Sequence, residues 1–330
     1  MVNQRIFVFT LLAVFFVTVF ATKKLIPVLL RKKIGQKILE IGPQWHKNKN
    51  GTPTMGGVGF VIAISIAFLL SLIIFGSEIE KREIYAIINV YFYGILNAII
   101  GMIDDLAKIR KKENEGLTPK GKLLLQSIAA VLFLVLMSQT GALTTEIKIP
   151  FTTVTIEMGF AYYVLAFLLL CGLTNAVNLT DGLDGLASTC VLTVGALLSF
   201  VGLLSIENVA FSFFGGALLG ATVGFLIFNF YPAKIFMGDT GSLFLGAVVV
   251  AVSFINNNPL IVLLYGFVFI CEAISVILQV GYFKLTKGKR LFKMAPLHHH
   301  FEKCGFGEVK VVAIFGLVSA IFCMVAYFGF

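Results

Sequence analysis

The stretch NAVNLTDGLDGL, residues Asn175 to Leu186, places two aspartates and two asparagines directly after a long apolar run. The preceding residues, Phe160 to Leu173, are apolar enough to lie in lipid. In lipid an ionised aspartate costs several kcal/mol unless it reaches water, a cation or a partner. We therefore predict that Asp181 and Asp184 belong to a functional site.

The other three aspartates of the chain, Asp104, Asp105 and Asp239, also lie at the ends of apolar runs rather than in polar loops. The twelve glutamates are scattered along the chain, so this placement is not a general acidic bias. The pattern indicates that the aspartates share a function.

The composition predicts an all-α integral membrane protein, with residues 1–330 forming a single membrane domain. Hydrophobic residues make up 58% of the chain and charged residues only 13%, whereas soluble domains carry about 25% charged residues. The net charge of +9 is better explained by basic cytoplasmic loops than by nucleic acid, which we do not expect as a partner.

Ten apolar segments are long enough for helices that span about 30 Å of hydrocarbon. They lie near residues 6–28, 54–75, 84–103, 121–140, 158–179, 185–205, 209–230, 241–256, 259–283 and 310–329. The eighth segment is short and begins at a glycine pair. Between the fourth and fifth, residues Thr144 to Glu157 alternate polar and apolar around Pro150, which predicts a small extracytoplasmic β-hairpin.

The distribution of basic residues predicts the orientation in the membrane. Loops after odd-numbered segments carry 22 of the 26 Lys and Arg residues. By the positive-inside rule these loops are cytoplasmic, and both termini are extracytoplasmic. All five aspartates then face the cytoplasm, which predicts an active-site cleft on that side.

The adjacent carboxylates of Asp104 and Asp105 repel each other unless a divalent cation or a nearby lysine removes the penalty. The alternative is a solvated pair at the membrane interface, balanced by Lys108 and Arg110. A lysine at position 108 suits an anionic phosphate better than a second metal ion.

The loop Tyr231 to Ser242, YPAKIFMGDTGS, brings Asp239 between two glycines just before the eighth segment. The carboxylate has two interpretations. It is either a helix N-cap, or part of a phosphate and Mg²⁺ site in which Gly238 lets the backbone approach closely and Lys234 adds charge.

Two further clusters of polar residues have both a functional and a structural interpretation. The segment PLHHHFE, Pro296 to Glu302, favours phosphate donation over zinc, because no second histidine or cysteine has ligand spacing. In the ninth segment Glu272, Ser275 and Gln279 share one helix face. These three form either a functional group or a polar contact between helices.

Five motifs occur in order: GTPTMGG (Gly51 to Gly57), the Asp104–Asp105 pair, NAVNLTDGLDGLA (Asn175 to Ala187), GDTGS, and MAPLHHHFE (Met294 to Glu302). Together they resemble the phospho-N-acetylmuramoyl-pentapeptide transferases, a branch of the polyprenyl-phosphate N-acetylhexosamine-1-phosphate transferase superfamily. The second and third motifs alone resemble the wider superfamily, and GTPTMGG and PLHHHFE resemble the muramoyl branch.

The resemblance implies the first membrane step of peptidoglycan synthesis, in the bacterial inner (plasma) membrane. The donor would be UDP-MurNAc-pentapeptide, the acceptor undecaprenyl phosphate, the products lipid I and UMP, and the cofactor Mg²⁺. A homodimer is one option for the assembly within the lipid bilayer.

The resemblance also implies roles for particular residues. Asp104, Asp105, Asp239 and His300 would be catalytic, with Asp239 binding Mg²⁺ together with Asp104 or Asp105. Uridine would be bound by Asn178, Asp181, Gly182, Asn229 and Phe236. Sugar and phosphate groups would be contacted by Gln279, His298 and His299. Independently of the resemblance, the charge count places the loops of Lys49, Lys108 and Lys120 on one side, and lysine suits phosphate, so we expect these lysines to neutralise the phosphates, with Lys122 as a substitute for Lys120. The remaining substrate contacts would be Thr54, Leu183, Asp184, Gly238 and Ala295.

Two alternative classes are open on the sequence alone. A lipid or nucleotide-sugar transporter would show charges at the membrane midplane and internal repeats, and an intramembrane protease would need two facing aspartates within spans. For the transferase, the mechanism is either direct transfer with Asp104 as base, or a two-step path in which an aspartate such as Asp239 attacks first.

Overall fold

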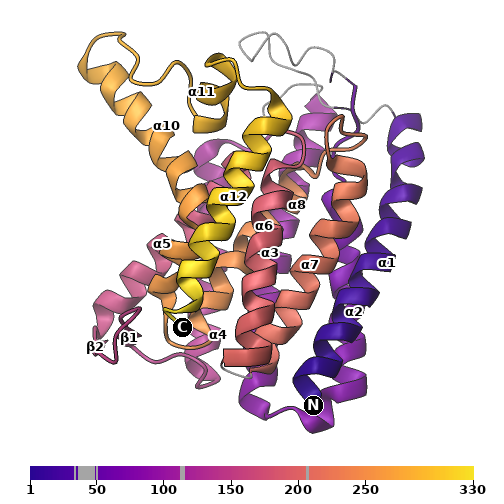
Figure 1. The fold of residues 1–330 in the computed structure, drawn as a ribbon, viewed down its shortest axis with the longest axis vertical. Coiled ribbons are helices and arrows are strands. Elements are labelled where there is room, and N and C mark those ends of the chain that lie inside the picture. The colour runs from indigo at the N-terminus through magenta and orange to yellow at the C-terminus, as the bar shows by residue number, and fades with distance from the viewer. Residues whose placement is uncertain (33–34, 36–48, 50, 112–115, 206–207) are drawn as a thin grey trace.

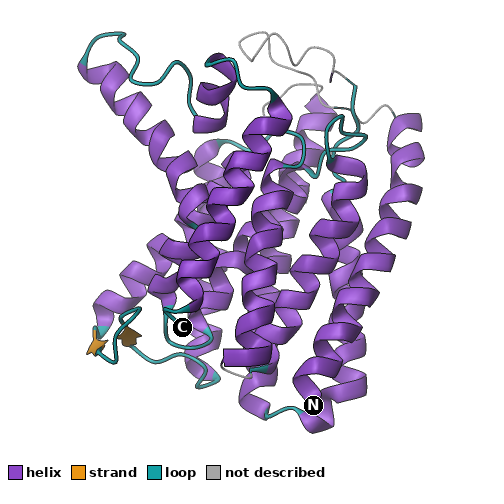
Figure 2. Ribbon diagram, viewed as in Figure 1, coloured by secondary structure: helices purple, strands orange, loops and turns teal. Residues whose placement is uncertain are grey.

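Long helices run up and down through the protein and make up most of the computed structural model (Figures 1 and 2). The structure describes residues 1–32, 35, 49, 51–111, 116–205 and 208–330. Its α-helices are α1 (Val2–Arg31), α2 (Gly57–Phe75), α3 (Lys81–Lys111), α4 (Pro119–Gln139), α5 (Phe160–Thr180), α6 (Leu186–Phe200), α7 (Val209–Asn229), α8 (Gly238–Ala251), α9 (Val262–Tyr265), α10 (Phe267–Leu285), α11 (Leu297–Lys303) and α12 (Glu308–Tyr327).

The prediction of an all-α integral membrane fold is confirmed. Among the described residues, nine helices are long and apolar enough to cross a membrane, and a shorter apolar helix covers Gly238–Phe254. The shorter helix is the eighth predicted segment. The ninth predicted segment is interrupted at Gly266, where α9 ends and α10 begins, so α10 leaves the bundle at its own angle (Figure 1).

The predicted hairpin is present as β1 (Glu146–Lys148) paired antiparallel with β2 (Thr155–Glu157). The hairpin lies at the same end of the bundle as both chain termini, and α11 lies at the opposite end (Figure 1). This grouping of termini and hairpin agrees with the predicted order of crossings. The basic segment 23–49, on which the predicted orientation partly depends, lies mostly outside the described residues.

Glycines allow α1 and α7 to pack backbone to backbone. A Cβ atom added at Gly216, Gly220 or Gly224 of α7 would lie 2.6–3.1 Å from carbonyl oxygens of α1. Small residues at every fourth position are the usual means of bringing membrane helices close together. The close contact between α1 and α7 thus depends on these glycines having no side chains.

Helix α8 lies inside the bundle, and its residues from Thr240 to Ala251 are all buried. A glycine of α3 and a glycine of α8 itself allow close contact with the neighbouring helices. A Cβ at Gly101 of α3 would be 2.2 Å from the Asp239 carbonyl oxygen, and a Cβ at Gly246 of α8 would be 2.7 Å from the Thr174 carbonyl oxygen of α5. The beginning of α8 is therefore fixed against the ends of α3 and α5.

The GTPTMGG segment holds the loop that precedes α8. The Phe236 N–H donates to the Pro53 carbonyl at 2.8 Å, and the Gly56 N–H donates to the Phe236 carbonyl at 2.8 Å. A Cβ at Gly57 would lie 2.2 Å from Gly241 Cα, so the two backbones touch. The motif thus holds in place the loop that leads to Asp239.

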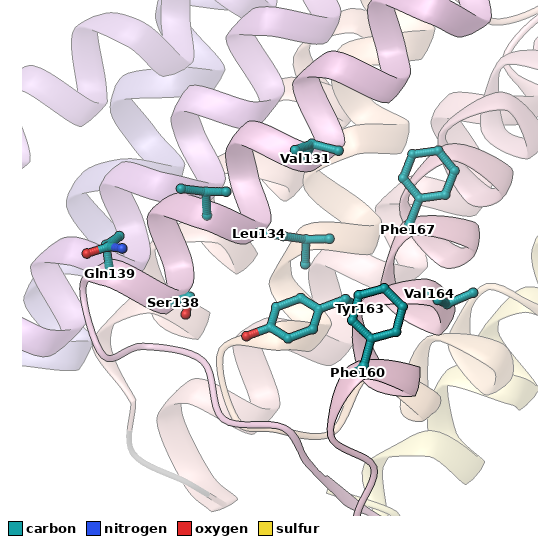
Figure 3. Close-up of a pocket in the computed structure, with 9 residues that line it drawn as sticks. Val131, Leu134, Ser138, Gln139, Phe160, Tyr163, Val164 and Phe167 are labelled. Carbon is teal, nitrogen blue, oxygen red and sulfur yellow. The ribbon is translucent and has the colours of Figure 1, made fainter.

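An apolar cavity of about 460 Å³ lies between α4 and α5, near the hairpin end (Figure 3). Its lining residues are Val131, Leu134, Val135, Ser138, Gln139, Phe160, Tyr163, Val164 and Phe167. None of them is charged, and no aspartate lies among them. The cavity is therefore separate from the polar cluster described next.

Candidate active site

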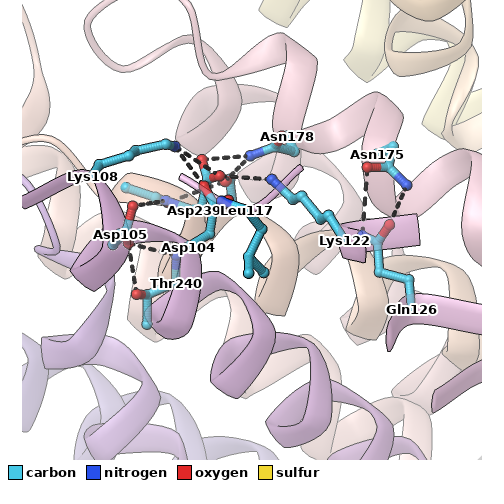
Figure 4. Close-up of polar contacts among 12 residues, drawn as sticks. Asp104, Asp105, Lys108, Leu117, Lys122, Gln126, Asn175, Asn178, Asp239 and Thr240 are labelled. Atoms are coloured by element: carbon cyan, nitrogen blue, oxygen red, sulfur yellow. Dashed lines mark hydrogen bonds and ion pairs between the residues drawn. The ribbon is translucent and has the colours of Figure 1, made fainter. Parts of the chain in front are cut away.

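Three carboxylates from two helices meet at the end of the bundle where α3 ends and α8 begins (Figure 4). Asp104, Asp105 and Asp239 each offer one oxygen, and these oxygens all lie within 4.8 Å of one another. Among the described residues this is the one such group of three His, Cys, Asp or Glu side chains. The structure therefore brings together the aspartates that the sequence leaves 134 positions apart.

Asp105 holds the first turn of α8. Its Oδ1 accepts the Asp239 N–H at 3.0 Å, and its Oδ2 accepts the Thr240 N–H at 2.9 Å and the Thr240 hydroxyl at 2.7 Å. The N-cap residue of α8 itself, Met237, makes no side-chain capping bond. The interpretation of Asp239 as the N-cap is thus wrong, because Asp105 satisfies those backbone groups from α3.

Asp239 is surrounded by donors. Its Oδ2 lies 3.0 Å from Lys108 Nζ and 2.6 Å from Lys122 Nζ, and its Oδ1 accepts an N–H of Asn178 at 3.1 Å. Lys120 is exposed, two residues before Lys122 on the first turn of α4. The lysine that reaches the cluster is therefore the one that the sequence offers only as a substitute.

Asp104 bridges α3 to the segment before α4. Its Oδ2 pairs with Lys108 Nζ at 2.6 Å, and its Oδ1 accepts the Leu117 N–H at 2.8 Å. Asp104 and Asp105 are each only 3% exposed. The alternative of a solvated interfacial pair is therefore wrong, although Lys108 does balance one of the two charges.

The donor set of this cluster fits a hard divalent cation. Mg²⁺ and Ca²⁺ take carboxylate oxygens as ligands, and Mg²⁺ is commonly bound through one or two carboxylates plus phosphate and water. Asp105 accepts from the backbone and the Thr240 hydroxyl of α8, whereas the Oδ2 atoms of Asp104 and Asp239 contact lysine side chains. Lys108 and Lys122 stand beside them as positive charges suited to a phosphate.

Asp184 and Glu308 form a second polar group, joined by Lys49. Asp184 Oδ1 lies 2.6 Å from Lys49 Nζ, and Asp184 Oδ2 accepts the Ala233 N–H at 2.9 Å. Glu308, the first residue of α12, pairs with Lys49 and accepts the Asp184 N–H. Lys49 is thus engaged with two carboxylates.

Asp181, just after α5, is half-buried, and its carboxylate makes no hydrogen bond or ion pair with the described residues. Burial raises the pKa of Asp181 well above its usual range, and the charges of Asp239, Asp105 and Asp184 raise it further. A carboxylate in this position attracts hydrogen-bond donors or a cation.

Several other predicted substrate residues brace the surrounding loops. The Asn229 amide donates to the Ile235 carbonyl at 2.9 Å. A Cβ at Gly238, whose φ is +70°, would lie 2.7 Å from Asp105 Oδ2 and 3.0 Å from Thr54 Oγ1. Phe236 is half-buried beside these residues. Leu183 is buried and Gly182 is exposed in the loop between Asp181 and Asp184.

The three consecutive histidines point to different partners. His298 is buried against Glu272, His299 Nδ1 lies 2.8 Å from Glu302, and His300 Nδ1 accepts the Lys293 N–H at 3.1 Å. His298 contacts the Asp181 loop, through Gly182.

The segment before the histidines is held by Gln279. Its Oε1 accepts the N–H groups of Leu291 and Phe292 at 3.1 and 2.8 Å. Ala295 is half-buried shortly before α11. Gln279 therefore supports the approach to the histidines, and its carbonyl oxygen does not point freely into the aspartate cluster.

Sequence reasoning missed Glu308 and Ser242. Glu308 gave no signal, because a glutamate at the start of a membrane helix is common. Ser242 Oγ accepts an N–H of Asn178 at 2.7 Å, and it lies three residues after Asp239 on the same helix face, so helical spacing offered a signal.

Comparisons with known proteins agree with this arrangement. A model of glycosyl transferase family 4 matches residues 87–257, and signature 1 of the phospho-N-acetylmuramoyl-pentapeptide-transferases matches residues 49–61. The phospho-N-acetylmuramoyl-pentapeptide-transferase of Halalkalibacterium halodurans is 42% identical over 327 residues, which is 98% of each chain.

Relatives of the same name give similar values. That of Staphylococcus aureus is 46% identical over 324 residues, and that of Bacillus subtilis is 43% identical over 322 residues. Each match covers 96% of this chain and 97% of the relative. The transporter and protease alternatives have no support in these matches. The chain is a multi-pass membrane protein that belongs to the phospho-N-acetylmuramoyl-pentapeptide transferase family.

Proposed function

We propose that this transferase moves phospho-MurNAc-pentapeptide from UDP-MurNAc-pentapeptide to undecaprenyl phosphate, giving lipid I and UMP. The observation that carries the proposal is the meeting of three carboxylates and two lysines at one end of a membrane helix bundle. A water-soluble diphosphate and a membrane-bound phosphate can meet at such an end. Transfer between them needs charge neutralisation and alignment above all.

The charge count of the loops supports a cytoplasmic location for this end of the bundle. The donor is a soluble nucleotide, so a cytoplasmic site gives it access, and the acceptor enters from the lipid. The residues in contact with both would be those near Asp239 and the Asp181 loop.

We infer that Asp239 and Asp104 hold Mg²⁺, because each has an oxygen paired with lysine side chains that could turn to a phosphate, whereas both oxygens of Asp105 hold the backbone of α8. When bound, Mg²⁺ would supply neutralisation of the developing phosphate charge. Lys108 and Lys122 would orient phosphate oxygens. Asp181 would accept hydrogen bonds from the uridine, and the neighbouring loop would keep the donor in place.

We further propose that Asp104 takes the proton of the acceptor phosphate. A phosphate monoester among anions holds its second proton more tightly, because like charges disfavour ionisation. Removal of that proton would give a dianionic nucleophile for direct attack on the donor's proximal phosphorus. Asp239 accepts from three donors, which makes its oxygens poor nucleophiles for the two-step path.

The reaction is tested by release of labelled UMP from UDP-MurNAc-pentapeptide with purified protein and undecaprenyl phosphate. Release that requires both the acceptor and Mg²⁺, and stops with EDTA, is expected. UMP release independent of the acceptor, or no release under any metal condition, would remove the proposal.

The mechanism is tested with a donor that carries a chiral thiophosphate. One displacement inverts the configuration at phosphorus and two displacements retain it. Inversion is the expected result. Retention would place the nucleophile on the protein and exclude Asp104 as the base of a direct transfer.

A further inference from the structure

Glu272 of α10 is a fully buried carboxylate that the proposed reaction does not use. Its Oε1 accepts the backbone N–H of His298 at 3.2 Å, and its Oε2 lies 3.1 Å from His298 Nδ1. A buried carboxylate needs a compensating partner. The His298 ring, only 1% exposed, is that partner.

The other nitrogen of this ring faces the Asp181 loop. A Cβ added at Gly182 would lie 2.3 Å from His298 Nε2, so the ring packs directly on the Gly182 backbone. Only glycine leaves room for the ring in this position. Through this contact α10 and α11 reach the residue between Asp181 and Leu183.

Neither ring nitrogen of His298 has a hydrogen-bond partner among the described residues, although the ring is buried: Nδ1 faces Glu272 Oε2 at ion-pair distance, and Nε2 faces the loop. A buried ring nitrogen without a partner is costly, and a ligand that supplies one would be favoured. A carboxylate beside Nδ1 orients the imidazole ring, and an N–H at the second nitrogen can then donate to a ligand. Phosphate oxygens are the strongest acceptors for such a group.

We propose that Glu272 is a positioning residue for the transfer reaction, holding the His298 ring so that Nε2 donates to a phosphate oxygen of the donor beside Gly182. The inference rests on the proposed function, because it takes the donor's diphosphate as the ligand. Glu272 itself does not touch the substrate. The competing role is a structural tie between α10 and α11.

The test uses the full-length enzyme with Glu272→Gln, His298→Gln and the double variant. Glu272→Gln keeps the side-chain shape but loses the charge, and is expected to lower kcat about 10- to 100-fold, as for other residues that orient a catalytic histidine. The double variant is expected to be no slower than His298→Gln alone, because Glu272 acts through that ring. Ser275→Ala is the matched control, since Ser275 is buried one turn away and donates only to the Glu272 backbone carbonyl.

A structural tie gives a different result. Losses in kcat that multiply in the double variant, together with a lower melting temperature for Glu272→Gln, would overturn the proposal, as would unchanged kcat. Should Glu272→Gln not fold, Gly182→Ala displaces the ring from the loop side and is expected to lower kcat with no further loss on adding His298→Gln; full activity in Gly182→Ala would overturn the proposal. Wild-type protein that releases no UMP would instead refute the proposed function.

Discussion

Asp105 and Asp239 belong to one cluster, but their contacts give them different roles. Asp105 accepts three donors from the first turn of α8, so its oxygens maintain the fold. Asp239 accepts from side chains of three other helices, and its carboxylate balances the positive charges of two lysines. The difference can be measured, because fold and turnover are separate properties.

Asp105→Asn is expected to lower the free energy of unfolding by about 1–3 kcal/mol, because an amide nitrogen would face backbone N–H groups. Asp239→Asn is expected to lower the melting temperature less than Asp105→Asn, since Lys108 keeps Asp104 as a partner, and to reduce UMP release to roughly a few per cent or less through loss of a metal ligand. Thermal unfolding in detergent and UMP release measure the two effects. Equal melting temperatures for both variants would contradict the division of roles.

The raised pKa of Asp181 predicts a pH-dependent cost to stability. The folded protein binds the proton of Asp181 more tightly than the unfolded chain does, because burial and three neighbouring carboxylates disfavour the charge. Stability from this group is therefore present at low pH and is lost as the pH rises from about 3.8, the ordinary value, through the folded pKa.

Asp181→Asn is accordingly expected to raise the melting temperature at pH 7, while the gain disappears near pH 4. The same variant is expected to weaken donor binding, measured as a higher KM. Melting curves over this pH range, with Asp184→Asn as the comparison, carry the test. Asp184 has a lysine partner, so its replacement is expected to lower stability at pH 7.

Lys120 and Lys122 lie on the same turn of α4 but only Lys122 contacts Asp239. Lys122→Gln is expected to lower kcat by about tenfold or more, as for other charge-assisted contacts in an active site. Lys120→Gln is expected to remain within about twofold of wild type, because an exposed charge contributes little. Similar kinetics for the two variants would mean that the contact with Asp239 does not matter for turnover.

At the scale of elements, α1 and α7 owe their contact to three glycines. Gly220→Ala is expected to cost about 1–3 kcal/mol, because the added Cβ meets a carbonyl oxygen of α1 at 2.6 Å. Gly172→Ala in α5 meets nothing within 4 Å and is expected to stabilise the helix by about 0.5–1 kcal/mol. Melting temperatures that move in opposite directions are the result to look for. A fall in both would indicate that helix packing is not the cause.

The sequence predicted the membrane helices well, because long apolar runs are a strong and local signal. It also predicted the hairpin, from alternation and a proline. It did not predict how the ninth segment divides at Gly266, since one glycine within an apolar run is common in membrane helices.

The aspartates of the site were predicted from their place at the ends of apolar runs, but their division of labour was not. Which carboxylate holds α8, and which lysine reaches Asp239, depends on how α3, α4 and α8 pack. Packing of this kind involves residues more than 100 positions apart. No local sequence pattern indicates these contacts.

At the scale of the whole molecule, Glu308 joins the start of α12 to the Asp184 loop and to Lys49. Glu308→Ala is expected to raise the donor KM by about tenfold, because the Asp184 N–H loses its acceptor and the loop becomes less ordered. The exposed neighbour Val309→Ala is the control. A large loss of kcat with unchanged KM would place Glu308 in the chemistry instead.

Asp239 has its counter-ions within the chain, because Lys108 and Lys122 both contact its Oδ2. A carboxylate neutralised in this way does not rely on a dissolved ion for its place in the structure, unlike the ligands of small domains that fold only around a metal. Purification and storage in chelating buffers should therefore leave the tertiary structure intact. Protein that is inactive after such treatment should therefore lack only a dissolved divalent cation. Dialysis against that cation should restore its activity.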